Sequence, residues 1–284
     1  MLGTTPANET MRTATDGVGL GVPLGVRLGI VLGIVLGTAT TGAAQCATQP
    51  SAIVTAYPIH SMDRPQPVIV TPAPAGAPVP APSDAIVLFD GKDLANWQAA
   101  DTTAPTSWFV KDGYMQVAGK TGDLETKRAF GDMQLHVEWM TPTPAEGEGQ
   151  ERGNSGVYLM KTFEVQVLDS YQNPTYADGA AGSVFGQYPP LVNASRPPGV
   201  WQTYDIVFHR PRFAANGTLQ CAARVTVFQN GVLVQNDAAL TGPTAYKRRP
   251  PYAAMPDKMP LLLQDHGHPV RFRDIWVREL GDAN

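Results

Sequence analysis

The stretch FEVQVLDSY, residues 163–171, carries chemically capable side chains at the spacing of a β-strand. Glu164 and Gln166 are two residues apart, so in an extended strand they project from one face, about 7 Å apart at the backbone. A carboxylate beside an amide can position a pair of sugar hydroxyls, or hold a proton donor while the other group accepts. Asp169 lies at odd spacing from Glu164 and joins them only if the strand ends or bulges before it. The structural alternative is that Glu164 pairs with an arginine across the sheet.

A second group of such residues lies near the C-terminus, in LLLQDHGHPVRFRDIWV, residues 261–277. Gln264 and His266 share strand parity and fall where a strand is expected to run into a turn, a common position for site residues. His266 is the most suitable proton carrier at neutral pH. Asp265 beside it resembles part of a metal site, but the sequence does not indicate a third ligand.

Two further candidates lie elsewhere in the chain. Arg271 shares a face with Arg273 and is suited either to pairing with Glu164 or to binding substrate. Tyr188 lies in a long Gly- and Pro-rich segment, residues 173–199. A segment of that length without secondary structure is usually functional, for example as a lid over a groove, so Tyr188 is predicted to line the site.

Other functional classes find no support in the sequence. A net charge of −4 provides no basic footprint for nucleic acid. The two cysteines, Cys46 and Cys221, predict neither a disulfide framework nor a zinc site. GNSGV, residues 153–157, lacks the spacing of a nucleophile elbow, and neither G-x-G-x-x-G in a βαβ context nor H-E-x-x-H occurs.

Residues 1–44 are predicted to be a secretory signal. The apolar run LGIVLGIVL, residues 28–36, follows Arg12 and Arg27 and precedes a small-residue cleavage site near residues 42–44. An uncleaved membrane anchor is the main alternative, because glycine recurs at every fourth position there. Arg27, however, shortens the uncharged run well below the ~18 residues that span a bilayer. We therefore expect a secreted or periplasmic protein.

Residues 45–82 contain nine prolines and no apolar period, which predicts a stiff, disordered linker. From residue 83 to the C-terminus at 284 the pattern is one of short strands. Asp112-Gly113 and Asn230-Gly231 each lie between two apolar runs and predict two-residue hairpin turns. Further strands are expected over residues 85–89, 133–140, 156–160, 163–168, 201–209, 260–264 and 270–278. With no convincing helical period, the predicted fold is all-β, an antiparallel two-sheet jelly-roll sandwich.

Six segments, taken in order, resemble the DUF1080 family, now termed the 3-keto-disaccharide hydrolase domain. They are LFDGKDLANW (88–97), RGNSGVYL (152–159), FEVQVLD (163–169), GVWQTYDIVF (199–208), VTVFQNGVLV (225–234) and LLLQDHGHPVRFRDIWV (261–277). The resemblance covers roughly residues 84–280. It implies a concanavalin A-like jelly roll of the lectin and glucanase type, an exported protein and a carbohydrate substrate.

The resemblance also implies an unusual cleavage of glycosides. A partner oxidoreductase converts the C3 hydroxyl to a ketone, which acidifies the C2 hydrogen. A base then removes that proton while the C1 leaving group departs, and water adds across the double bond. Such a site needs a base, a proton donor and a group that polarises the ketone. It does not need the two carboxylates of ordinary glycosidases.

Roles carried over from the resemblance remain open in part. Glu164 and His266 are predicted as base and acid in undetermined order, with Asp169 as a third catalytic residue. The predicted substrate-binding residues are Asn154, Ser155, Gln166, Tyr188, Gln264 and Arg271. A divalent metal held by some of Glu164, Asp169 and His266 is an alternative way to polarise the ketone. A glycan-binding module without catalysis and a structural protein of the cell envelope are the alternative functions.

Overall fold

The computed structural model describes residues 54, 56–100 and 105–281. The predicted signal, residues 1–44, lies outside the described residues. No helix in the described part of the chain has the length and apolar character needed to cross a membrane.

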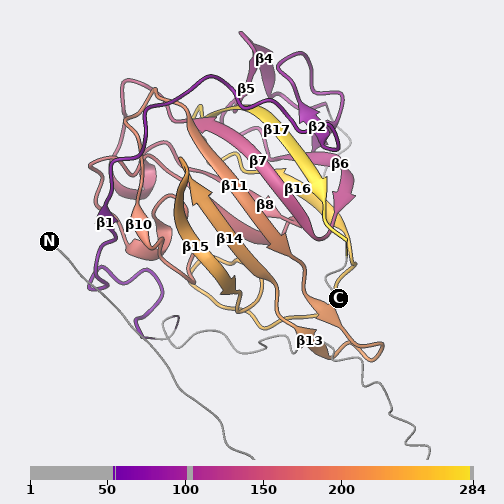
Figure 1. Ribbon diagram of the computed structural model, residues 1–284. Coiled ribbons are helices and arrows are strands. Elements are labelled where there is room, and N and C mark those ends of the chain that lie inside the picture. The colour runs from indigo at the N-terminus through magenta and orange to yellow at the C-terminus, as the bar shows by residue number, and fades with distance from the viewer. Residues whose placement is uncertain (1–53, 55, 101–104, 282–284) are drawn as a thin grey trace, which may run out of the picture. The chain divides into compact units, whose positions relative to one another are not determined.

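The larger of two main sheets has eight strands, and Figure 1 shows β15, β14, β11, β7 and β17 side by side. The order is β15-β14-β11-β7-β17-β5-β4, and β2 also pairs with β17. The bounds are β2 Ile86–Phe89, β4 Phe109–Lys111, β5 Tyr114–Gln116, β7 Met133–Met140, β11 Gln202–His209, β14 Arg224–Gln229, β15 Val232–Ala239 and β17 Arg271–Glu279.

The smaller sheet has five strands in the order β3-β6-β16-β8-β9. Its strands are β3 Trp97–Ala99, β6 Leu124–Phe130, β8 Ser155–Leu159, β9 Phe163–Val167 and β16 Met259–Leu263. The remaining elements are β1 Val68–Ile69, β10 Val192–Asn193, β12 Arg212–Phe213 and β13 Leu219–Cys221, with two 3-10 turns, η2 Gly149–Glu151 and η3 Ala177–Gly179.

The two sheets bury their apolar faces against each other. Along β11 every second residue is buried, because successive side chains of a strand point to opposite faces. Phe208 of β11 contacts Phe163 of β9 across the core, with ring centroids 5.7 Å apart. The predicted two-sheet sandwich is therefore confirmed, and the predicted strand ranges agree with the observed ones to within one residue at each end.

Both predicted hairpin turns are present. Asn230 has φ of 54° and Gly231 has φ of 79°, and the pair connects β14 to β15. Asp112 and Gly113, with φ of 49° and 80°, connect β4 to β5 in the same way. Two successive residues in the left-handed region match the right-handed twist of the strands they join, which is why Asn-Gly and Asp-Gly occur there.

The predicted linker differs from the structure over its described residues. β1 pairs in parallel with β10, and the Arg196 guanidinium donates hydrogen bonds to the Ala73 carbonyl at 2.9 and 3.1 Å. Closer to its start, the segment inserts His60 among aromatic residues of the sandwich, and the Arg64 side chain is buried. The composition predicted disorder, but these backbone and side-chain contacts attach the segment to the domain. A proline-rich sequence can form them because its non-proline residues keep their donors.

Candidate functional site

β9, which carries Glu164 and Gln166, is buried on both of its faces. Phe163, Val165 and Val167 face the core, as the alternation predicts. On the opposite face Glu164 and Gln166 are also buried, with only 3% and 1% of their surfaces exposed. An edge strand with a buried polar outer face requires a cover, and the chain around η2 and η3 supplies it.

Tyr158 on β8 lies directly opposite Glu164 on β9 in the antiparallel register. Its hydroxyl donates a hydrogen bond of 2.9 Å to Oε2 of Glu164. Gln264, which follows β16, donates from Nε2 to the same hydroxyl at 3.3 Å. Neighbouring strands of one sheet thus bring together a carboxyl, a phenol and an amide.

A glycine makes room for the carboxyl group. Gly156 of β8 is the neighbour of Tyr158 on this face, and a Cβ atom at that position would lie 2.5 Å from Oε1 of Glu164. Any other residue at 156 would therefore displace the carboxyl group. Glycine is therefore required at position 156 by the packing of the Glu164 side chain, and not by the backbone conformation of a turn.

The amide group of Gln166 lies within hydrogen-bonding distance of Glu164. In one orientation its nitrogen donates to Gln150 Oε1 at 3.1 Å and to Asn154 Oδ1 at 3.4 Å. In the reversed orientation the nitrogen donates to Oε1 of Glu164 at 3.0 Å and to the Ser155 carbonyl at 3.1 Å. An ionised Glu164 favours the second orientation, whereas a protonated Glu164 can donate to the amide oxygen in the first.

Glu164 is an acid that titrates near neutral pH. Burial raises its pKa to about 8, the negative charge of Asp123 raises it too, and the hydrogen bond from Tyr158 opposes the shift. Burial favours the uncharged form because the low-dielectric interior solvates a carboxylate poorly. A carboxyl group that exchanges its proton near working pH is suited to general acid–base catalysis.

Gln264, which contacts the Tyr158 hydroxyl, also carries a side-chain oxygen that could accept a hydrogen bond. Its Oε1 atom is buried and has no hydrogen-bond partner among the described residues. A buried acceptor without a partner costs free energy, and native structures seldom keep one without a reason. A hydroxyl group of a bound substrate would satisfy it.

His266 lies two residues beyond Gln264 and is exposed. Its ring stacks on that of His268 at a centroid distance of 5.7 Å, and His268 Nε2 lies 3.1 Å from the carbonyl oxygen of Glu151. No contact joins His266 to Glu164 in the described part of the chain. The histidine is therefore exposed beside His268 and separate from the contacts of Glu164.

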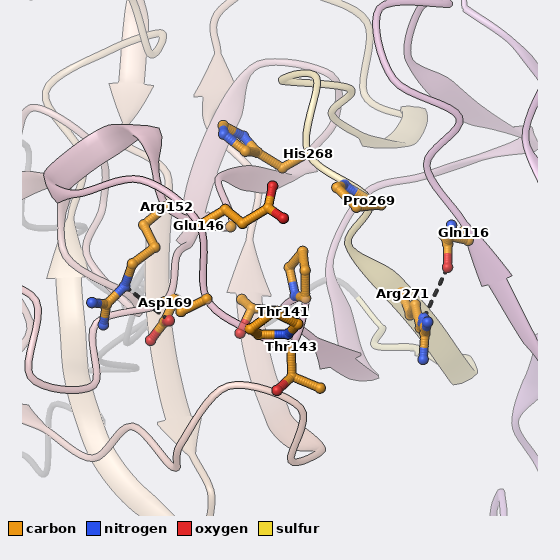
Figure 2. Close-up of a pocket in the computed structure, with 13 residues that line it drawn as sticks. Gln116, Thr141, Thr143, Glu146, Arg152, Asp169, His268, Pro269 and Arg271 are labelled. Atoms are coloured by element: carbon orange, nitrogen blue, oxygen red, sulfur yellow. Dashed lines mark hydrogen bonds and ion pairs between the residues drawn. The ribbon is translucent and has the colours of Figure 1, made fainter.

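Asp169 belongs to a different part of the molecule from Glu164. β9 ends at Val167, and the Asp169 carboxylate then pairs with Arg152, whose Nε lies 2.9 Å from Oδ2. Both residues line a neighbouring cavity of about 250 Å³, in which Figure 2 shows Glu146 and His268 facing the same space. β9 does end before Asp169, as its joining Glu164 would require, but the contact that the structure shows for the Asp169 side chain is with Arg152.

Arg271 lines the opposite side of this cavity. Its Nε donates to Gln116 Oε1 at 2.8 Å, as Figure 2 shows, and its guanidinium lies 4.7 Å from the centroid of the Tyr114 ring. It belongs to β17 of the larger sheet, and its side chain makes no hydrogen bond or ion pair with Glu164 among the described residues. Of the two alternatives for Arg271, pairing with Glu164 is therefore not observed, and substrate binding stays a prediction.

Two other predicted site residues have structural roles. Ser155 is opposite Val167 on the core-facing side, and its hydroxyl donates at 2.7 Å to the Gln264 carbonyl, which ties β8 to β16. Tyr188 is buried in the hydrophobic core, where its hydroxyl donates at 2.6 Å to the Ala239 carbonyl. Asn154, by contrast, lies beside Gln166 as expected.

The residues proposed to hold a metal do not come together. Glu164 is bonded to Tyr158, Asp169 to Arg152, and His266 stacks on His268. Across the described residues, no group of three or more His, Cys, Asp or Glu side chains has an arrangement suited to an ion.

Sequence reasoning missed Tyr158 and Gln150. A signal for Tyr158 was present, because RGNSGVYL and FEVQV are separated by only a few residues and form the β8–β9 hairpin. Pairing the two strands about that turn places residue 158 opposite residue 164. No comparable signal exists for Gln150, which reaches Gln166 from the loop around η2.

Comparison with known proteins gives a family match and similar crystal structures. The family described as "3-keto-alpha-glucoside-1,2-lyase-like domain" matches residues 84–278. A crystal structure from Parabacteroides distasonis ATCC 8503, described as a candidate glycosyl hydrolase, is 46% identical and covers 76% of this chain and 93% of its own, with a TM-score of 0.68.

A second candidate glycosyl hydrolase from the same organism is 20% identical, covers 70% of this chain and 94% of its own, and has a TM-score of 0.51. At that identity it supports the fold alone. No curated protein matches the chain.

Proposed function

Because the chain belongs to the family of 3-keto-alpha-glucoside-1,2-lyase-like domains, we propose that it cleaves the glycosidic bond of 3-keto-glycosides by elimination and hydration. Family and structural similarity make it a glycosyl hydrolase-like, carbohydrate-active protein. One observation supports the finer proposal above the others. Glu164 is a buried carboxyl group with a pKa of about 8, surrounded by amide and phenol groups that can bind hydroxyls.

The proposed reaction has two steps. In the first, a base removes the C2 proton, which the C3 ketone acidifies. The C2–H electrons form a C1=C2 double bond, the C1–O bond breaks, and the departing oxygen takes a proton from an acid. In the second, water adds across the double bond, with its hydroxyl on C1 and a proton returned to C2. The net change is the hydrolysis of one glycosidic bond, with the ketone unchanged.

We assign the acid to Glu164 and the base to His266. A carboxyl group with a pKa of about 8 is largely protonated at neutral pH and can give its proton to the departing oxygen. The resulting carboxylate accepts hydrogen bonds from Tyr158 and from the reversed amide of Gln166, which stabilise it. His266, an exposed imidazole two residues beyond Gln264, would act on the same ligand from the open side. Gln264 Oε1 would accept a hydrogen bond from a sugar hydroxyl.

The test is a product assay on the full chain with 3-keto-trehalose and 3-keto-glucosides, with the unoxidised sugars as controls. We expect release of 3-keto-glucose only from the oxidised sugars. In D₂O the new sugar should carry deuterium at C2 faster than the spontaneous exchange in a blank without protein. Cleavage of unoxidised sugars, or cleavage without a kinetic isotope effect from C2-deuterated substrate, would argue against elimination.

Three variants test the assigned roles. Glu164→Gln keeps the shape of the side chain but removes its proton, and we expect a loss of rate of about 10²- to 10⁴-fold. His266→Ala should show a loss of the same order. Glu279→Gln is the matched control, because Glu279 pairs with Arg128 and Lys258 at the far end of β17. A chain that binds the sugars but cleaves none would be a glycan-binding module.

We also propose that the protein is exported, on the basis of the N-terminal sequence pattern alone. Expression of the full chain in a bacterial host, followed by cell fractionation and sequencing of the N-terminus, tests this. A mature N-terminus near residue 45 in the periplasm or medium would support export. An intact N-terminus in the cytosol would count against it.

A further inference from the structure

His60 comes from a part of the chain that precedes the family match at residues 84–278. Its side chain is only 5% exposed, although the sequence around it predicts a disordered linker. Three aromatic rings surround it, with centroids at 4.1 Å for Tyr176, 4.9 Å for Phe185 and 5.7 Å for Tyr246. A segment outside the family domain is thus inserted among aromatic side chains of the sandwich.

Asp178 holds His60 in this position. The backbone N–H of His60 donates to Oδ2 of Asp178 at 3.1 Å, and its Nδ1 lies 3.5 Å from Oδ1. Asp178 is fully buried, and a buried carboxylate requires such partners. The backbone hydrogen bond and the approach of the ring to Asp178 hold His60 in place.

Two of the segments that carry these aromatic residues contact the backbone of Glu164 at the outer edge of β9. The backbone N–H of Phe185 donates to the Glu164 carbonyl at 3.3 Å. The backbone N–H of Glu164 donates to Oγ1 of Thr244 at 3.0 Å, and Tyr246 follows two residues later. Tyr176 is partly exposed, and Tyr246 is 65% exposed.

Tyr246 is exposed but is held by the buried ring of His60, and an exposed aromatic side chain fixed in this way is suited to binding a ligand. Free aromatic side chains on a protein surface change rotamer readily, but the Tyr246 ring stacks on His60 at an interplanar angle of 29°. The ammonium group of Lys247 lies 5.0 Å from the Tyr246 centroid and adds a hydrogen-bond donor. Ligand sites commonly combine aromatic surface with a few polar groups in this way.

We propose that Tyr176 and Tyr246 form an aromatic platform for the apolar C–H face of a sugar ring, and that His60 is a positioning residue that holds this platform beside Glu164. The platform rests on the proposed function, because the sugar stacked on it would present its glycosidic bond to the Glu164 carboxyl. Aromatic rings bury apolar surface while keeping a polar edge in water, which suits a ligand with one apolar face and many hydroxyls. The N-terminal segment is then part of the substrate site.

Binding is measured separately from cleavage, in the full chain carrying Glu164→Gln. Saturation-transfer NMR and calorimetry with trehalose and 3-keto-trehalose give the dissociation constants. We expect Tyr246→Ala and His60→Ala, each added to Glu164→Gln, to weaken binding at least tenfold. Met62→Ala is the matched control in the same segment, because Met62 is 63% exposed, and it should leave binding unchanged.

A ring-preserving variant separates positioning from folding. His60→Phe keeps a ring between the tyrosines and removes only the ring nitrogen beside Asp178, so it should bind better than His60→Ala. In the catalytically intact chain, Tyr246→Ala should raise KM at least tenfold while kcat stays within twofold. Equal binding by Tyr246→Ala and its parent, or no binding of either sugar by the parent, would overturn the platform.

The two proposals can fail separately. If the intact chain cleaves 3-keto-trehalose while the platform variants bind and cleave normally, the platform is wrong and the proposed reaction stands. If no oxidised sugar is cleaved but the platform variants still lose binding, the platform stands and the proposed reaction is wrong.

Discussion

The hydroxyl group of Tyr158 donates a 2.9 Å hydrogen bond to Oε2 of Glu164, across the register of the β8–β9 hairpin. This bond stabilises the ionised form of a carboxyl group that burial otherwise keeps protonated. The balance of the two effects leaves the pKa at about 8, close to working pH. A structural acid would not need such a balance, whereas an acid that donates and recovers a proton in each cycle does.

The rate of cleavage should fall as pH rises through about 8. If Glu164 acts as the acid, it must be protonated when substrate binds, and the fraction protonated halves at its pKa of about 8. The measurement is kcat/KM for 3-keto-trehalose between pH 5 and 10. An increase in rate through pH 8 would instead identify Glu164 as the base.

Tyr158→Phe serves as the control for that assignment. Removing the hydroxyl removes the bond that stabilises the carboxylate, so the pKa of Glu164 should rise and the alkaline limb should move to higher pH. An unchanged limb would mean that another group controls it.

Glu164→Gln should stabilise the fold at alkaline pH. The pKa of Glu164 is raised in the folded state, so between pH 4.5 and 8 the unfolded chain releases a proton that the folded chain retains. Stability therefore falls as pH rises across this window. The upper limit of the effect is roughly 5 kcal/mol, since each pKa unit corresponds to about 1.4 kcal/mol. Urea unfolding of both proteins at pH 4, 6 and 9 measures it, and a constant difference at all three values would contradict the assignment.

Asp169→Asn should affect stability rather than catalysis. The change leaves the Arg152 guanidinium, which is 15% exposed, without its charged partner. Breaking a buried pair in this way typically costs about 3–5 kcal/mol. Thermal unfolding and kcat should be measured together, with Asp84→Asn as a control because the Asp84–Arg278 pair is on the surface. A large loss of kcat in a stably folded Asp169→Asn protein would restore Asp169 to the catalytic set.

His136 should also make stability fall as pH rises, over a higher pH window than Glu164. Burial alone would lower its pKa, but hydrogen bonds with Asp205 and Glu138 raise it to about 9. The folded state therefore retains a proton that the unfolded chain loses near pH 6.5, and the resulting stability is present below pH 6.5 and lost as pH rises through about 9.

The variant His136→Gln removes this contribution. We expect the wild type to exceed it in unfolding free energy by up to roughly 3 kcal/mol at pH 6, and by much less at pH 10. A difference that is equal at both pH values would show that packing against Trp276, rather than charge, accounts for the role of His136.

Local periodicity was sufficient to predict the sandwich. Alternation along 202–209 and the left-handed residues at Asn230-Gly231 depend only on neighbours in sequence, and both appear in the structure as expected. The same alternation correctly placed Glu164 and Gln166 on one face of β9. It could not place Asp169, because parity ceases to apply once a strand ends and β9 ends at Val167.

The sequence by itself determined that this protein is an all-β sandwich of its family, with an acid and an amide on one strand. Only the tertiary structure decided that Glu164 is buried, that Asp169 pairs with Arg152, and that His60 reaches Asp178 across 118 positions of sequence. The reason is physical. Strand and turn preferences arise from adjacent residues, whereas burial, and with it the pKa of a carboxyl group, depends on which distant segments cover the strand.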